Sequence, residues 1–243
     1  MTTFKIGVVC EGPTDFYAIK NYLGNCLTKA GKNVSFVDLH PEVDKTRTDG
    51  GWARIHHWLG QLSPRDRYDR FVSRGLFAGN MDRKMCDCFL IQADTDIIPE
   101  LGFQNTVQNT SGLDVAALAA SNPPQDVMLQ VLENWASMDS AAPGEKKVHV
   151  FCPAVESTEN WCIAAFKRWP TNPEGYSGQT LTDHFMECLE RQEGRDPSPP
   201  YSEISKNVSR RKKFCEATGK SSRRLRAQCA QYNKAFKELS ALC

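Results

Sequence analysis

The sequence lacks any long apolar run. Nowhere in its 243 residues do about 18 apolar residues follow one another, which is the length that a membrane-spanning helix needs. The N-terminal stretch FKIGVVC is shorter than the apolar core of a signal peptide and is followed at once by Glu11. These absences exclude the membrane-spanning class, and we expect a cytoplasmic protein with no membrane partner.

A surplus of one charge is also missing, since 30 Lys and Arg residues stand against 29 Asp and Glu residues. No segment repeats at a fixed period, which argues against a solenoid or a propeller. The 40% of hydrophobic residues and the 24% of charged residues are ordinary for a globular protein. The length is enough for one large domain, or for a core domain with an appendage.

Cysteine pairs with the spacing of a zinc site are missing too. The ten cysteines are scattered, and Cys10, Cys152 and Cys162 lie inside apolar runs. Cys86 and Cys88 are separated by one residue instead of two to four, and no second Cys or His pair follows at zinc-site spacing. Without a signal peptide, reduced thiols that fill the core are favoured over a disulfide framework.

Apolar runs do alternate with stretches of helical periodicity. The runs predict strands at 4–10, 34–39, 88–94 and 147–152, and the periodic stretches predict helices at 13–23, 52–62, 113–120, 124–138 and 158–169. The polar residues 41–51 predict a loop, as does the Asn-, Thr- and Ser-rich stretch after Asp96. Strands that read as continuous apolar runs and alternate with helices predict an α/β fold. Its sheet is expected to be mostly parallel, with helices on both faces.

The C-terminal part differs in composition. We expect an α/β domain over 1–190, a charged and Pro-rich linker or loop over 191–203, and a basic helical extension over 204–243. In that extension, apolar residues recur every three or four positions, which predicts one amphipathic helix through Leu225, Cys229, Tyr232, Phe236 and Leu239.

Positive charge is concentrated between Lys206 and Arg226. Nine Lys and Arg residues stand there against Glu216 alone, a local net charge of +8. Such a segment attracts polyanions, although a charge run can also be a solvated face. We expect nucleic-acid phosphates to be contacted by Lys206, Arg210, Arg211, Lys212, Lys213, Arg223 and Arg224.

Acidic residues follow the predicted strands. Glu11 follows the first strand, Asp94 and Asp96 close the third, and Glu156 and Glu159 follow the fourth. In an open α/β sheet, ligands bind outside the carboxyl ends of the strands. Side chains two apart on an extended backbone share a face, so Asp94 and Asp96 can bind one Mg²⁺ ion. Each acid alone could equally be a turn or cap residue.

Three motifs in order resemble one family. VVCEGPTDFYAI followed by FLIQADTD is similar to the two signatures of the TOPRIM domain. The stretch ESTENWCIAAF, with Glu159 and Trp161 at the start of a helix, resembles a motif of the RloB-like proteins. These are associated with restriction and abortive infection and are related to the OLD-family nucleases. The resemblance covers about residues 4–170.

The resemblance implies roles for particular residues. Glu11 would be the acid/base group or a metal ligand, and Asp94 and Asp96 would hold Mg²⁺ or Mn²⁺. Asp15 stands where the family often has an acidic residue and would be a further ligand. Glu159 would be an accessory acid, a role for which Glu156 competes.

The function that the resemblance implies is metal-dependent cleavage of phosphodiesters in DNA or RNA, in antiviral defence. A topoisomerase needs a Tyr nucleophile on a further large domain, and a primase normally has a zinc module. Nucleic acid is the expected partner, an ATPase partner protein is left open, and no small-molecule cofactor is expected. A TOPRIM module that binds nucleic acid or a partner without cleaving is an alternative, and so is a nucleotide phosphohydrolase.

His56 and His57 are the remaining candidates. Neighbouring positions on a helix point about 100° apart, so both side chains cannot readily bind one metal ion. We expect structural or surface histidines.

Overall fold

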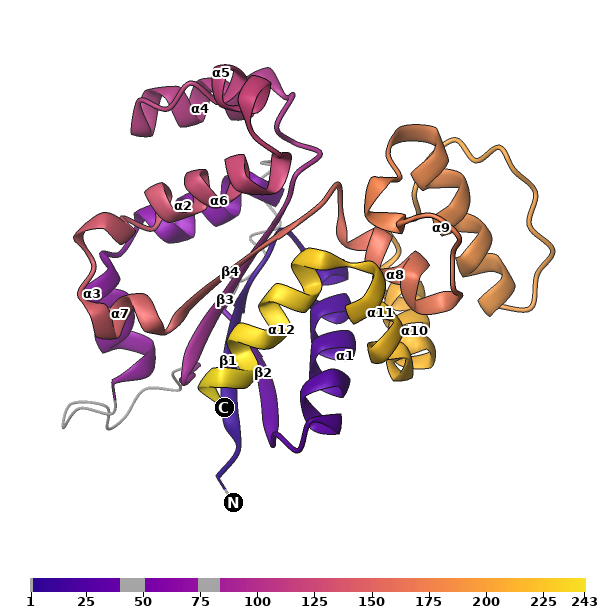
Figure 1. Ribbon diagram of the computed structural model, residues 1–243, viewed down its shortest axis with the longest axis horizontal. Coiled ribbons are helices and arrows are strands. Elements are labelled where there is room, and N and C mark those ends of the chain that lie inside the picture. Colours follow the sequence, from indigo (N-terminus) through magenta and orange to yellow (C-terminus); the bar gives the residue numbers. More distant parts are fainter. Residues whose placement is uncertain (1, 40–50, 74–83) are drawn as a thin grey trace.

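Four parallel strands form the centre of the protein (Figure 1). The structure, a computed structural model, describes residues 2–39, 51–73 and 84–243. Neighbouring strands pair in parallel in the order β2-β1-β3-β4, so all four carboxyl ends lie at one edge of the sheet. The predicted α/β class with a parallel sheet is confirmed. The strands are β1 (Phe4–Val9), β2 (Val34–Asp38), β3 (Cys88–Asp94) and β4 (His149–Ala154).

Helices cover both faces of the sheet (Figure 1). One face carries α1 (Pro13–Lys29), α8 (Thr158–Phe166), α9 (Gly178–Gln192), α10 (Val208–Thr218), α11 (Ser222–Gln228) and α12 (Ala230–Leu242). The other carries α2 (Gly51–Gly60), α3 (Pro64–Arg67), α4 (Leu101–Ser111), α5 (Val115–Ser121), α6 (Pro124–Trp135) and α7 (Pro143–Lys147). Short turns of other helix types lie at Tyr68–Val72, Met138–Ser140, Pro173–Gly175 and Gly219–Ser221. None of the helices described is long and apolar enough to cross a membrane.

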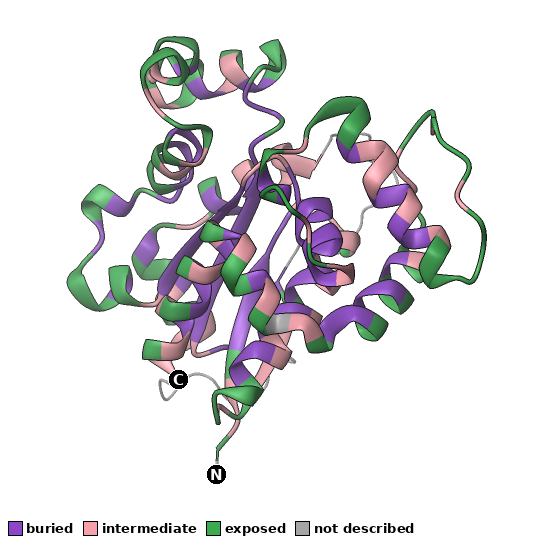
Figure 2. Ribbon diagram, turned by 45° about the vertical axis from the view of Figure 1, so that its right-hand side comes forward, coloured by how far each residue is buried: buried purple, intermediate pink, exposed green. Residues whose placement is uncertain are grey.

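The side chains of each strand are divided between two apolar cores. Ile6, Val8 and Leu90 face the core beneath α1 and α12, whereas Phe89 and Ile91 face the core beneath α2 and α6. Successive side chains of a strand point to opposite faces, so both sets must be apolar. Figure 2 shows the central strands buried nearly throughout, with the exposed residues on the outer sides of the helices.

The C-terminal helices share the core of the α/β domain. Phe214, Leu225 and Tyr232 are buried together with the side chains of β1 and α1. The Tyr232 hydroxyl donates a hydrogen bond to the Tyr22 carbonyl at 2.8 Å. Residues 204–243 therefore complete the main core, although the charge pattern predicted a separate extension. Residues 195–203, in the region predicted as a linker or loop, form neither helix nor strand.

Two predicted elements differ in the structure. The amphipathic helix expected over 225–239 is two helices, since the backbone of Cys229 between α11 and α12 is extended. The loop expected after Asp96 is wrong over Leu101–Ser111, which forms α4. Phe103 and Val107 of α4 are buried four residues apart, and hydroxyls such as that of Thr106 donate to carbonyls four residues earlier. The loop predicted at 41–51 lies, except for Gly51, outside the described residues.

Candidate active site

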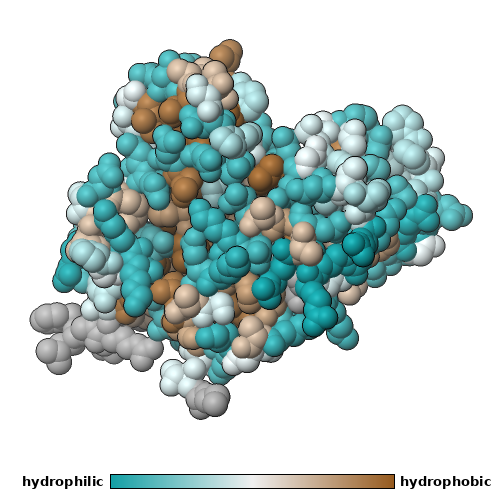
Figure 3. Space-filling model, in the orientation of Figure 1, coloured by the Kyte–Doolittle hydropathy of each residue, from teal (hydrophilic) through white to brown (hydrophobic). Residues whose placement is uncertain are grey.

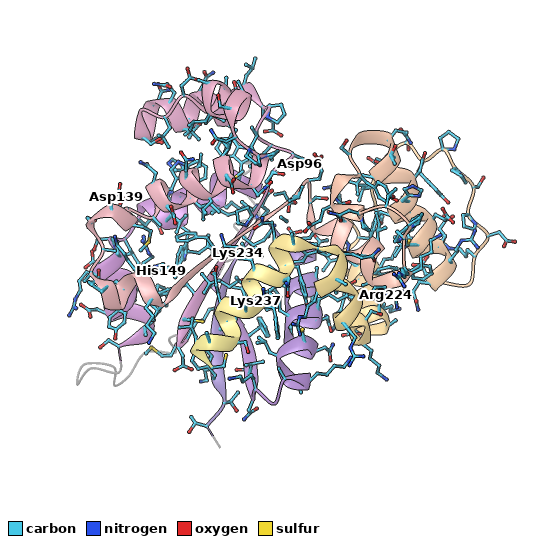
Figure 4. The ribbon with its side chains drawn as sticks, in the orientation of Figure 1. Asp96, Asp139, His149, Arg224, Lys234 and Lys237 are labelled. Carbon is cyan, nitrogen blue, oxygen red and sulfur yellow. The ribbon has the colours of Figure 1, made fainter. Side chains whose placement is uncertain are left out.

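The acids predicted at the strand ends line one pocket of about 270 Å³ at the carboxyl edge of the sheet. Figure 4 shows Asp96 at this edge, between the α4–α5 pair and the group of α8 and α9. The pocket is lined by Glu11, Gly12, Thr14, Asp15, Gly51, Asp94, Asp96, Ser157, Glu159, Leu181, Ile204 and Lys206. The residues that the motifs single out thus lie together, although they come from distant parts of the chain.

Glu11 stands between β1 and α1. The strand is buried up to Val9, and Pro13 then occupies the first turn of α1, where its missing amide is not needed. The Glu11 Oε1 atom accepts a hydrogen bond from the Asp94 amide at 3.0 Å, which ties together the ends of β1 and β3.

Gly51, the first residue of α2, lies against Glu11. A Cβ atom at this position would stand 2.5 Å from Glu11 Oε2, closer than real contacts allow. Only glycine therefore lets α2 begin beside this carboxylate. Sequence reasoning missed this residue, because its only local signal is a position in a polar, glycine-containing stretch.

Asp15 lies in the first turn of α1 and is 6% exposed. Its Oδ1 atom accepts a hydrogen bond from the Thr158 hydroxyl at 2.6 Å, which joins the N-terminal ends of α1 and α8. Burial and the charge of Glu159 raise the pKa of the Asp15 carboxyl. Its carboxylate is therefore part of the pocket wall and is already fixed in position.

Asp94 and Asp96 both line the pocket, although Asp96 lies in the turn after β3 and not on the extended backbone that the prediction assumed. Asp94 is the last residue of β3, and its Oδ1 atom accepts a hydrogen bond from the Gln92 side chain at 2.6 Å. Asp96 is exposed, and its amide donates to the Glu156 carbonyl at 3.2 Å. The pair therefore offers one buried carboxylate and one that solvent reaches.

The structure separates the two candidates for the accessory acid. Glu159 lines the pocket, whereas Glu156 has a left-handed backbone with φ of 55° and is not among the lining residues. Glu159 is only 5% exposed and forms an ion pair with Arg211 of α10. Burial alone would raise the pKa of Glu159, but the charge and hydrogen bond of Arg211 outweigh it and lower this pKa.

Burial and mutual repulsion shift the other carboxyls in the opposite direction. Burial and the charge of Asp15 raise the pKa of Glu11 to about 8. Partial desolvation by the neighbouring pocket wall and the charge of Glu159 raise the pKa of Asp96 to about 6, although solvent reaches this side chain. Burial and the charge of Glu11 raise the pKa of Asp94 well above its ordinary value. These acids therefore bind protons more tightly than free carboxyls do, and a bound cation would compete with those protons.

The residues expected to contact phosphate are not all available. Arg211 corrects that expectation, since it is 1% exposed and pairs with Glu159, so no phosphate can reach its side chain. Arg210 pairs with Glu193 at 2.7 Å. Lys212, Lys213 and Arg223 are exposed, and Arg224 is half-buried.

Lys206 lies in the carboxylate pocket itself. Its positive charge lowers the pKa values of Glu11, Asp15 and Asp96, in each case against the larger effect of burial. The basic segment thus places one exposed cation directly beside the acids.

The donors of the pocket suit a hard divalent cation, since they are carboxylate oxygens of mutually repelling groups. Among the described residues, however, no three His, Cys, Asp or Glu side chains are gathered closely enough to hold a metal ion as they stand. The chemistry of the donors therefore fits Mg²⁺ or Mn²⁺, whereas the described conformation is not itself a coordination sphere.

The histidines of α2 lie away from these acids. The His56 ring packs on Trp135 with centroids 4.7 Å apart, and His57 is exposed and contacts Gln61.

Comparisons with protein-family models, with curated proteins and with solved structures give no match to this chain. The resemblance to TOPRIM domains therefore stays a prediction from the three motifs.

Proposed function

We propose that this chain is a TOPRIM-type, divalent-metal-dependent nuclease that cleaves phosphodiesters in nucleic acid. The observation that supports it best is the convergence of Glu11, Asp94, Asp96 and Glu159 on one pocket at the carboxyl edge of a parallel sheet. That edge is where α/β folds bind their ligands. From the resemblance, we further propose a cytoplasmic effector of antiviral defence, with an ATPase partner left open.

In this proposal Asp94 and Asp96 hold Mg²⁺ or Mn²⁺, and Glu11 and Asp15 are the further ligands available in the pocket. When bound, the metal would polarise the phosphoryl oxygen and stabilise charge on the leaving oxygen. Glu11 has a pKa of about 8, so its carboxyl can accept or release a proton near neutral pH. In either role, the hydrogen bond from the Asp94 amide holds the Glu11 carboxyl at the end of β3.

The cations have two roles in the proposal. Lys206 is exposed and lies beside the acids, where its ammonium group can contact a substrate phosphate. Arg211 instead holds the carboxylate of Glu159 ionised and in place at the pocket wall. Lys212 and Lys213 on the exposed side of α10 would extend the phosphate contacts along the nucleic acid.

A second candidate is a TOPRIM module that binds nucleic acid or a partner without cleaving. Two observations favour it, namely the ion pair that occupies Glu159 and the lack, among described residues, of three acids at metal-binding distance. A nucleotide phosphohydrolase would use the same acids but leave Lys212 and Lys213 without a role.

The test is cleavage of labelled DNA and tRNA by the purified protein with Mg²⁺ or Mn²⁺. We expect cleavage that a chelator stops and that Asp94→Asn/Asp96→Asn lowers by at least about 10²-fold, because the metal would lose both carboxylates at the end of β3. Asp139→Asn, an exposed acid far from the strand ends in Figure 4, is the matched control and should keep full activity. Cleavage that survives both the chelator and the double substitution would refute the proposal, whereas binding without cleavage would support the second candidate.

A further inference from the structure

A second cavity, of about 760 Å³, lies where α8 ends. It is formed by the loop that follows α8, the turn Gly219–Ser221 and α11. Its wall includes four cationic side chains, and none of the other lining residues is acidic. The lining residues used below are Arg168, Trp169, Lys220, Arg223, Arg224 and Gln228.

This cavity is separate from the carboxylate pocket. Glu159 lies at the start of α8, whereas Arg168 and Trp169 follow its end. Nine helical residues rise by about 13 Å, so α8 stands between the acidic and the basic site. Figure 4 likewise shows Asp96 at the strand ends and Arg224 in a different part of the molecule, among the C-terminal helices.

None of the four cations has an acidic partner among the described residues. In the described part of the chain, the side chains of Arg168, Lys220 and Arg223 form no ion pair, unlike Arg210 with Glu193 and Arg191 with Glu187. Scattered unpaired cations are common on solvated surfaces, but these line one concave site. The face over α9 and α11 in Figure 3 is mainly hydrophilic. A concave site with four positive charges focuses its field on an anion.

Arg224 is already oriented for such a ligand. Its Nη1 atom donates to the Phe166 carbonyl at 3.2 Å and its Nη2 atom donates to the Ser221 hydroxyl at 3.1 Å. A guanidinium group has five N–H donors, so three remain for a ligand. A fixed guanidinium fork suits the paired oxygens of a phosphate, because little side-chain entropy is lost on binding.

Gln228 and Trp169 form part of the cavity wall beside these cations. The Gln228 side chain donates to the Trp169 carbonyl at 2.9 Å, while its Oε1 atom is buried and has no partner among the described residues. The Trp169 ring is held by its Nε1–H bond to the Ile163 carbonyl at 2.9 Å.

We propose that this cavity binds a phosphorylated nucleotide, either free or as the phosphorylated end of a nucleic-acid strand. The four cations complement a phosphate chain, and Trp169, which lines the same cavity, offers an apolar surface to the nucleoside. The volume is within the roughly 300–1,000 Å³ of small-molecule sites. The inference goes beyond cleavage and gives Arg223 and Arg224 a specific ligand, and it stands whether or not the carboxylate pocket is catalytic.

The test is isothermal titration calorimetry of the full chain in EDTA, so that no metal-dependent step contributes. The probes are ATP, tripolyphosphate, and one hexanucleotide with and without a 5′-phosphate. We expect ATP or the 5′-phosphorylated strand to bind with a Kd below about 1 mM. Arg168→Gln/Arg223→Gln should weaken that binding at least about tenfold, since each side chain faces the cavity and forms no ion pair in the described structure.

Lys146→Gln/Lys147→Gln removes the same charge from exposed positions of α7, on the other face of the sheet, and is the matched control. It should change the affinity less than about twofold. Binding by ATP alone would assign the site to a free nucleotide, and binding by the phosphorylated strand alone would assign it to a strand end. The inference would be overturned if no probe binds, or if the two strands bind equally and ATP does not bind. It would also be overturned if both double variants lose the same affinity. Tripolyphosphate binding as tightly as ATP would overturn its nucleoside part.

Discussion

At the scale of single residues, Glu11 connects the fold to the proposed chemistry. Glu11 is half-buried, and its carboxyl accepts a hydrogen bond from the Asp94 amide. The charges of Asp15 and Asp96 act on it as well. The folded chain therefore favours the neutral form of the Glu11 carboxyl over its ionised form. The consequence is a dependence of stability on pH that can be measured without any substrate.

The first prediction concerns that dependence. The pKa of Glu11 is about 8 in the folded chain against an ordinary 4.5, so the folded state holds this proton more tightly than the unfolded state. The stability from this group is therefore complete below about pH 4.5 and is lost as the pH rises through 8. In EDTA, Glu11→Gln should raise the midpoint of thermal unfolding relative to the wild type by at least about 3 °C more at pH 8 than at pH 5. Glu203→Gln, at an exposed loop position, is the control. An identical difference at both pH values would show that the fold does not raise the pKa of Glu11.

The second prediction concerns Gly51. A methyl group there would meet the Glu11 side chain at 2.5 Å, so either α2 or the carboxylate must move. We expect Gly51→Ala to lower the free energy of unfolding by about 1–3 kcal/mol, the usual cost of overpacking, as measured by urea denaturation. Gly60→Ala changes the other end of α2, where nothing lies within 4 Å of the added carbon, and should not destabilise the protein. Equal effects of the two substitutions would show that α2 does not abut Glu11.

At the scale of elements, the ion pair of Glu159 and Arg211 joins α8 to α10. Arg211 also lies over the Phe185 ring at 4.4 Å, so this guanidinium connects α8, α9 and α10. The adjacent Arg210 forms an ion pair at the surface instead, with Glu193. Two neighbouring arginines of one helix thus have opposite environments, which gives a matched pair of substitutions.

The third prediction uses that pair. Arg211→Met keeps most of the side chain's bulk but leaves the buried Glu159 carboxylate without its partner, and should cost about 3–5 kcal/mol of unfolding free energy. Arg210→Met removes an ion pair whose side chains are 27% and 30% exposed, and should cost less than about 1 kcal/mol. Denaturation at pH 7 measures both. If Arg211→Met costs no more than Arg210→Met, α8 and α10 are not joined through a buried charge.

At the scale of the whole molecule, the sequence predicts what local patterns determine. The bounds of β3 follow from the sequence because every residue from Cys88 to Asp94 is buried, so the apolar run and the strand coincide. Glu11, Asp94 and Asp96 are predictable for the same reason, since each follows an apolar run whose end marks the carboxyl edge. α4 is not, because its two buried positions are outnumbered by polar residues that bond their own backbone.

The pairing of distant segments is the part that the sequence leaves open. Arg211 reads as one more cation of a basic run, and only the packing of α10 on α8 shows that it is buried against Glu159. Gly51 likewise becomes a site residue only when the fold brings it to the pocket. Lys206 is predicted only as one of seven phosphate-contacting cations, and the fold places it beside the acids. The C-terminal helices also pack into the main core. The sequence does not predict this, because the charged residues on their exposed sides dominate its pattern.

The central claim, that the strand-end acids form a divalent-metal site, is tested most directly by titrating the protein with Mn²⁺ and following free Mn²⁺ by electron paramagnetic resonance. At pH 8, where fewer protons compete for the acids, the wild type and Asp139→Asn should bind Mn²⁺ with a Kd of about 100 μM or tighter. Asp94→Asn/Asp96→Asn should weaken this binding at least about tenfold, because two of the oxygen donors lose their charge. Equal Mn²⁺ binding by the wild type and the double variant, or no binding by the wild type, would contradict the account.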